Sequence, residues 1–374
     1  MKKIFWAIQN LECIGGTETV SIDLMNLLAD TYEIHLVCST RVEEKVNYHL
    51  DPRIIVHNLG VSPEISRFDQ SWAEYGRSKQ YGKRIKLLWM TFVEYVLRRH
   101  KRRKQIASWM GKDDIYVGSA LDSYLNAPKG VKVFYHFHFS ANNFLSFWNQ
   151  LMFRFVSKPE RFIFLTNETL KEVTAKKKKI KAAAIHNPIK FDPVLSTDLH
   201  LHSLLFVGRF AEQKDPFLAL NVAKCLHDER YPFTLTMMGE GHFLTQMNEF
   251  VKKNELSEVK IVTGHTTTRE DYLAHDLLLC TSVHEGFCLV KNEANAASLP
   301  VVTSRWDGPI EEVFDRSNDG FIIESRNPVD YANRIKETLS DETKFKEMKK
   351  RAYESSLKTS PLKIKEQWIS LFGK

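Results

Sequence analysis

The sequence predicts an α/β protein of two doubly wound, Rossmann-like domains that face each other across a cleft. Short runs rich in β-branched and aromatic residues alternate with longer segments of helical spacing, and this series occurs twice along the chain. The runs are almost continuously apolar, which is typical of parallel strands in a sheet covered on both faces. Pro188 and Pro193 favour extended backbone between the two series, so we expect the joint at residues 186–194.

The two series define the expected domains. Strands of the first are expected at 3–10, 32–39, 53–59, 114–120, 131–137, 161–167 and 181–187. Strands of the second are expected at 203–209, 233–239, 259–264, 276–282, 300–305 and 320–325. The domains then span residues 1–188 and 189–360, and the last segment, 361–374, has helical spacing.

Composition narrows the class of protein. The 374 residues are 43% hydrophobic and 26% charged, as in soluble globular proteins. No run of about 18 or more apolar residues occurs, so no membrane-spanning segment is expected. Residues 1–10 read as a first strand rather than a signal peptide. The five cysteines form no CxxC pair, which favours a reducing cytoplasm without a disulfide framework or a zinc site.

The net charge of +7 is unevenly distributed. Residues 77–104 hold eleven Lys or Arg residues and one acid, Glu94, and a second basic run ends at Lys181. Basic surfaces attract anionic partners such as nucleic acid, an anionic membrane or a phosphorylated substrate. No aromatic-basic recognition motif accompanies them, so we expect no specific nucleic-acid partner.

Residues 83–104 have helical spacing with an apolar stripe beside the cations. The stripe consists of Ile85, Leu88, Trp89, Phe92, Val93 and Val96. One interpretation is an amphipathic helix on an anionic membrane surface, which would make the protein peripheral at the inner face of the cell membrane. The other is an ordinary helix that packs this stripe on the sheet and keeps its cations in water.

In open parallel sheets, ligands bind beyond the carboxyl ends of the strands, so residues that follow strands are the candidates for a site. Gly15 and Gly16 follow the first strand and open a helix, where the backbone can approach an anionic ligand. The pattern is not GxGxxG, and no acid ends the second strand, which disfavours a dehydrogenase. A simple loop is the alternative.

Gly208 and Arg209 end the first strand of the second series, and Lys214 follows before Asp215 and Pro216 begin a helix. An Arg and a Lys at this position would suit a diphosphate, although solvated surface cations are the alternative. His265 follows Gly264 after another strand, where either a tight turn or a ligand contact explains it.

Glu285 and Glu293 are separated by an apolar segment, and they could be surface carboxylates, paired catalytic acids or ligand contacts. We expect Glu285 in a loop after a strand, where Gly286 permits close backbone approach. A helix from about residue 290 to 298 would put Glu293 near its first turn. A carboxylate there can accept hydrogen bonds from the two hydroxyls of a ribose.

His136 and His138 close a strand of the first series, and strand alternation puts them on one side. The pair could bind a metal, but no third ligand and no DxD motif accompanies it. The remaining alternatives are core or surface histidines and a histidine that contacts substrate hydroxyls.

The motifs together resemble glycosyltransferase family 4: GGxE after the first strand, HNP at the joint, FVGR with a lysine five residues later, and E-x7-E as EGFCLVKNE. SLPVVTSRWDGPIEEV is also similar to that family's donor site, and the resemblance covers essentially the full chain. It implies the GT-B fold, with the helix at 361–374 crossing back onto the first domain. It also implies a retaining, hexosyl-type transfer from a nucleotide sugar without an obligatory metal or other cofactor.

The resemblance also implies roles for individual residues. Arg209 and Lys214 would neutralise the donor diphosphate, Glu293 would hold the ribose, and Glu285 would contact the donor sugar. Backbone amides near three residues would contact sugar or phosphate: Phe287, Cys288 and Leu289. Gly16 would let its loop approach the diphosphate, and HFS favours His138 over His136 in the cleft. Cys288 departs from the small residue or proline common in the family.

We therefore expect a glycosyltransferase that uses a nucleotide sugar, with UDP as the expected nucleotide, and a cell-surface glycan or lipid-linked acceptor. The alternative is a catalytically silent GT-B subunit that binds or stabilises a partner glycosyltransferase. Intact Arg209, Lys214, Glu285 and Glu293 argue against that alternative.

Overall fold

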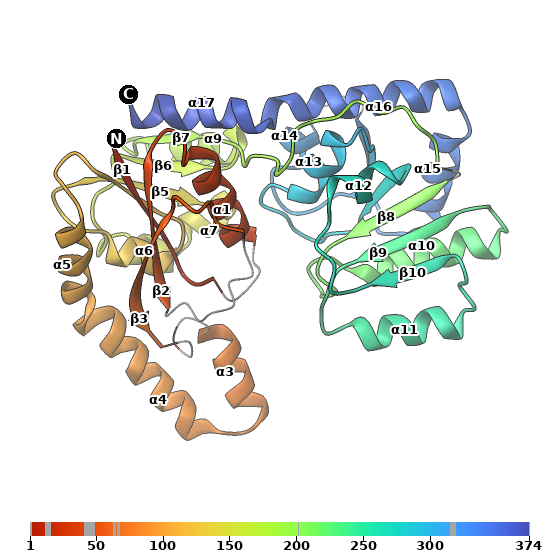
Figure 1. Cartoon of the computed structure of the whole chain (residues 1–374). Helices are drawn as coiled ribbons and strands as arrows, with labels where there is room; N and C mark the ends of the chain where they lie inside the picture. The colour runs from red at the N-terminus through yellow and green to blue at the C-terminus, as the bar shows by residue number, and fades with distance from the viewer. Residues whose placement is uncertain are drawn as a thin grey trace. The chain divides into compact units, whose positions relative to one another are not determined.

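The structure is a computed structural model of the chain and describes residues 2–11, 16–40, 49–62, 65, 68–200, 202–314 and 319–373. Contacts between Cα atoms group residues 1–186 with 365–374 as unit 1, and residues 187–364 as unit 2. Each unit is a parallel β-sheet covered by helices (Figure 1). The predicted fold class, α/β with two Rossmann-like domains, is confirmed.

Unit 1 has a parallel sheet in the strand order β3-β2-β1-β4-β5-β6-β7. Its strands are β1 (Lys3–Ile8), β2 (Glu33–Thr40), β3 (Ile55–Val61), β4 (Ile115–Gly118), β5 (Lys132–Phe137), β6 (Arg161–Phe164) and β7 (Ala182–Ala184). Its helices are α1 (Gly16–Leu28), α3 (Phe68–Arg77), α4 (Tyr81–Phe92), a π-helix (Val93–Leu97), α5 (Arg99–Trp109), α6 (Leu121–Asn126), α7 (Ala141–Leu145), α8 (Phe147–Met152) and α9 (Asn167–Lys176).

Unit 2 has a parallel sheet in the order β10-β9-β8-β11-β12-β13. Its strands are β8 (Ser203–Val207), β9 (Thr234–Met238), β10 (Val259–Val262), β11 (Leu277–Cys280), β12 (Val301–Ser304) and β13 (Gly320–Ile323). Its helices are α10 (Pro216–Asp228), α11 (Leu244–Lys253), α12 (Arg269–Leu273), α13 (Leu289–Ala296), α14 (Ile310–Phe314), α15 (Pro328–Leu339), α16 (Glu342–Ser356) and a short 3-10 turn (Leu357–Thr359).

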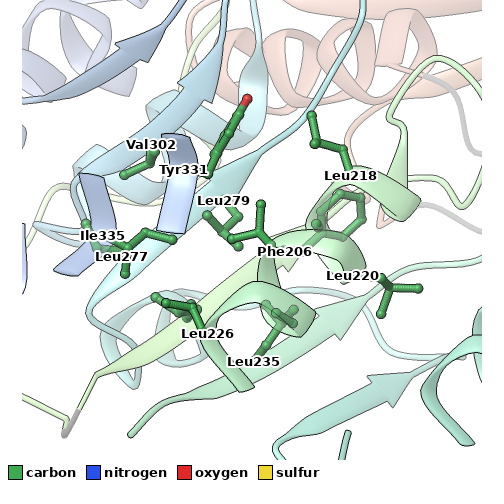
Figure 2. Packing of buried hydrophobic residues seen from close by; sticks show 14 of the residues in the cluster. Phe206, Leu218, Leu220, Leu226, Leu235, Leu277, Leu279, Val302, Tyr331 and Ile335 are labelled. Carbon is green, nitrogen blue, oxygen red and sulfur yellow. The ribbon is translucent and has the colours of Figure 1, made fainter. Parts of the chain in front are cut away.

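Each predicted run overlaps one of these strands, because parallel strands buried on both faces need continuous apolar sequence; β2 and β3 extend past the predicted ends, to Thr40 and Val61. In unit 2, Phe206 of β8 and Leu279 of β11 pack with Leu218 and Leu226 of α10 in one core cluster (Figure 2). Strand winding reverses direction between β8 and β11, which are neighbours in the sheet. Loops after these two strands therefore meet at a topological switch point, where ligands bind in such sheets.

The last helix, α17 (Pro361–Phe372), packs its end against unit 1. Lys365 bonds to Asp30, and the Trp368 ring lies 5.2 Å from the Trp6 ring of β1. Trp368 has no exposed surface, so this helix completes the core of unit 1. None of the helices within the described residues is long and apolar enough to cross a membrane.

Candidate functional site

Lys214 and Glu285 meet at the switch point of unit 2. Lys214 lies in the loop between β8 and α10, Glu285 lies in the loop between β11 and α13, and Lys214 Nζ is 2.5 Å from Glu285 Oε1. Both side chains are largely buried. Burial works against the charged form of Lys214, but the Glu285 carboxylate raises its pKa above the ordinary value. Lys214 is therefore a cation at neutral pH.

The Lys214 loop is held by bonds to the neighbouring loop. Asp215 caps α10 by accepting from Leu218 N, with Pro216 at the first helical position, as predicted. Thr281 Oγ1 donates to the carbonyls of Lys214 and Asp215 at 2.8 Å. These bonds tie the two strand-end loops together and fix the position of the Lys214 backbone.

Close backbone packing also requires glycine beside these loops, as Gly239 and Gly308 show. A Cβ on Gly239, after β9, would lie 1.9 Å from the carbonyl oxygen of Gly208. A Cβ on Gly308, which has a φ of +140°, would lie 2.1 Å from the carbonyl oxygen of Glu285. The carbonyl of Asp307, which precedes Gly308, also accepts a hydrogen bond from Glu285 N. The Glu285 loop is thus fixed by residues of the segment SLPVVTSRWDGPIEEV, whose similarity to the family 4 donor site the sequence indicated.

Helix α13 begins at Leu289, earlier than predicted, so Glu293 lies in its second turn rather than near its first. The reason is Cys288, which caps the helix in a left-handed conformation with a φ of +53°. Its side chain makes no capping hydrogen bond, so the first turn of α13 keeps N–H groups without a side-chain cap, as an anion site requires. Proline is excluded at this φ.

Glu293 is held by two residues that the sequence did not identify. Tyr272 of α12 donates its hydroxyl to Glu293 Oε2 at 2.5 Å, and Lys190 Nζ lies 3.7 Å from Glu293 Oε1. Burial and the Glu293 carboxylate raise the pKa of Tyr272 well above its usual range, so the phenol remains a donor. Glu293 is therefore an oriented, partly buried carboxylate rather than a free surface group.

Other predicted donor residues have simpler surroundings. Arg209 is exposed, and its side chain has no ion pair within the described chain. Phe287 and Cys288 are buried, whereas Gly286 and Leu289 are half-buried. The exposed His265 ring lies 2.7 Å from Asp271 Oδ2, and Asp271 belongs to the capping box of α12. Turn and cap chemistry thus accounts for His265 without a ligand.

The remaining predicted residues belong to unit 1. Gly16 is the exposed first residue of α1, and Gly15 lies outside the described residues. His136 is 1% exposed between the rings of Trp6 and Trp368, with neither ring nitrogen hydrogen-bonded within the described residues. His138, after β5, is half-buried, and burial lowers its pKa to about 3. His138 is therefore neutral at physiological pH and the more accessible of the two.

Comparison with known proteins agrees with this architecture. Residues 194–355, which contain Lys214, Glu285 and Glu293, match the family model for glycosyl transferases group 1. An uncharacterized glycosyltransferase of Methanocaldococcus jannaschii is 25% identical over 282 residues, which cover 72% of this chain and 77% of that protein. The poly(ribitol-phosphate) alpha-N-acetylglucosaminyltransferase of Staphylococcus aureus is 27% identical over 170 residues, 45% of this chain and 34% of that protein.

Among solved structures, a mutant of S. aureus TarM in complex with Fondaparinux, alpha-GlcNAc-glycerol and UDP aligns over the full length of both chains. Its TM-score is 0.75 at 16% identity, which establishes a shared fold. Taken with the family match over unit 2, these similarities support a glycosyltransferase with the GT-B fold.

Proposed function

We propose that this protein is a retaining, family 4 glycosyltransferase that moves a hexose-type sugar from a UDP sugar to an anionic cell-envelope glycan or its lipid-linked precursor. The observation that carries the proposal is the Lys214–Glu285 ion pair at the switch point of the unit 2 sheet. An exposed ion pair would add little to the stability of the fold, whereas a buried cation at the ligand-binding edge of the sheet suits a diphosphate.

The donor would lie across the strand-end loops of unit 2. Glu293, oriented by Tyr272, would accept the ribose hydroxyls, and the uncapped first turn of α13 would face the diphosphate. Lys214 and the exposed Arg209 would supply the positive charge that stabilises the leaving group. Glu285, already paired with Lys214, would contact the sugar and position it above the diphosphate.

Retention follows from a front-face reaction in this proposal. The acceptor oxygen bonds to the anomeric carbon on the face from which the UDP oxygen departs. The electron pair of the broken carbon–oxygen bond goes to the phosphate, and the acceptor hydroxyl proton passes to the same phosphate oxygen. Neutral His138 would contact hydroxyl groups of a substrate from unit 1 rather than act as a cation.

The acceptor class rests on two similarities and on charge. One relative is named for transfer to poly(ribitol-phosphate), and another, from Bacillus subtilis, is a poly(glycerol-phosphate) alpha-glucosyltransferase. Both polymers are polyanions, which suits a chain of net charge +7.

A thermal-shift screen with UDP, UDP-GlcNAc, UDP-glucose and GDP-mannose tests donor binding, because a ligand of the folded state raises its Tm. The best donor is then incubated with poly(ribitol-phosphate), poly(glycerol-phosphate) or a lipid-linked glycan, and the product's anomeric configuration is measured by NMR. Inversion would overturn the retaining assignment. If none of these nucleotide sugars binds, the result would favour the catalytically silent subunit instead.

A further inference from the structure

Helix α4 exposes a continuous row of large apolar side chains. The exposed fractions are 62% for Tyr81, 70% for Ile85, 48% for Leu88, 63% for Trp89 and 47% for Phe92. The rings of Trp89 and Phe92 stack, with centroids 5.8 Å apart. At 3.6 residues per turn these five residues fall within an arc of about 100°.

The orientation of this row is opposite to that of a normal surface helix. Amphipathic helices of globular proteins turn their apolar stripe to the core. In α4 the one buried residue is Leu87, on the far side of the helix from the row. The helix therefore packs through its other face, and the row forms an apolar surface that monomeric proteins rarely leave uncovered. The alternative in which the stripe packs on the sheet is wrong for the residues from Ile85 to Phe92.

Exposed cations accompany the row, and the acid of this segment is neutralised internally. Lys86 is exposed on α4, one turn before Met90 and on the flank of the row next to Trp89, and Lys101 and Lys104 are exposed on α5. Glu94, the single acid of residues 77–104, is buried in an ion pair with Arg102. The surface of this segment is thus apolar and positive.

Some cations of the segment have structural roles and are not counted toward this surface. Arg102 also donates to Asn126 at 2.9 Å, and Arg103 donates to the Leu125 carbonyl at 2.8 Å. Arg84 stacks on Trp72 of α3 at 4.6 Å, and Lys83 Nζ lies 5.4 Å from the centre of the Tyr75 ring of α3. These contacts anchor the segment to unit 1 while leaving the row free.

We propose that α4 binds the interface of an anionic lipid bilayer, with this row in the headgroup region and the lysines against lipid phosphates. Aromatic side chains with one polar end are favoured at that depth, and Tyr81 and Trp89 are of this kind. Two copies of this chain meeting through the row would bring like charges together, which disfavours a homodimer here. Binding would hold unit 1, which carries His138, at the surface where envelope glycans are built on lipid.

Flotation of the full chain with vesicles tests the proposal. We compare phosphatidylcholine vesicles with vesicles containing about a third phosphatidylglycerol, at low and high salt. The protein is expected to float with the anionic vesicles at low salt, to bind neutral vesicles at least tenfold more weakly, and to be partly released by high salt.

Two variants separate the contributions. The apolar variant Ile85→Ser/Leu88→Ser/Trp89→Ser and the charge variant Lys86→Glu/Lys104→Glu change exposed residues, and each is expected to bind at least tenfold more weakly. Matched controls elsewhere, Leu195→Ser/Val329→Ser and Lys344→Glu/Lys350→Glu, also change exposed positions and are expected to bind as the wild type does. Unchanged Tm and UDP-sugar binding would show that the variants fold.

The proposal is overturned if the wild-type chain does not bind anionic vesicles at low salt, or if the apolar variant binds as well as the wild type. It is also overturned if light scattering detects a wild-type dimer that the apolar variant abolishes, because the row would then be an interface between copies. None of these outcomes depends on the identity of the donor sugar.

Discussion

Lys214 Nζ lies 2.5 Å from Glu285 Oε1, although the two residues are 71 positions apart in the chain. The contact joins the loops after the two central strands of the unit 2 sheet. Of the two predicted donor-binding cations, Lys214 is the one that the fold buries, since Arg209 remains exposed. The proposed stabilisation of the leaving diphosphate therefore depends most on Lys214.

Replacing Lys214 by methionine is expected to lower kcat/KM for the donor by about 10²–10³-fold, the usual cost of removing one group that stabilises transition-state charge. Lys214→Arg keeps the charge and should lose less. The control is Lys224→Met, which removes an exposed lysine also 2.5 Å from a carboxylate and should leave kcat/KM unchanged. Equal activity of Lys214→Met and wild type would refute the diphosphate role.

Glu293→Ala is expected to weaken UDP binding by roughly 10- to 100-fold, because it removes hydrogen bonds to a charged acceptor. Tyr272→Phe removes only the bond that orients Glu293, so a loss of about 2- to 10-fold is expected. Glu285→Gln should instead lower kcat with UDP affinity little changed. Calorimetric titration with UDP measures the affinity of the Glu293→Ala and Tyr272→Phe variants, and steady-state kinetics measures kcat of the Glu285→Gln variant. A Glu285→Gln variant with weaker UDP binding and normal kcat would contradict the assignment of Glu285 to the sugar.

The strands and the Asp215–Pro216 helix start were predictable because each depends on local sequence: apolar runs for buried strands, and a capping residue followed by proline. The E-x7-E motif likewise indicated a loop glutamate and a helical one. The start of α13 was not predictable, because cysteine is not a preferred capping residue and Cys288 adopts its left-handed conformation in tertiary context.

Contacts between Glu293 and residues of distant segments could not be predicted from the sequence either. Tyr272 lies in a short helix and Lys190 lies within the proline-containing joint, so neither carries a local signal for contact with Glu293. The stripe of α4 had the right period, but periodicity states which residues share a face and not whether that face is turned inward. Only the buried Leu87 on the opposite side decides that question.

Lys291, inside the E-x7-E segment, is a structural residue. Its Nζ lies 2.7 Å from Asp319 Oδ2, and both side chains are 1% exposed. Lys291→Met should therefore destabilise unit 2 by about 3–5 kcal/mol, since it leaves a buried carboxylate unpaired. Adding Asp319→Asn should recover part of the loss. Urea unfolding measures both, and Lys346→Met, which breaks the exposed pair with Glu342, should cost under about 1 kcal/mol.

His138 should make stability fall as the solution becomes acidic. Burial lowers its pKa from 6.5 to about 3, so between these values the unfolded chain binds a proton that the folded chain does not. The free energy of unfolding is therefore not reduced by His138 above pH 6.5. As the pH falls from 6.5 toward 3, it decreases by up to about 1.4 kcal/mol per pH unit. His138→Gln should thus lose less Tm than the wild type between pH 7 and pH 5.

The exposed His100→Gln serves as the control and should track the wild type, because an exposed histidine keeps most of its hydration on folding. If His138→Gln loses as much Tm as the wild type over this range, the ring is hydrated in the folded protein and His138 is free to act as a cation.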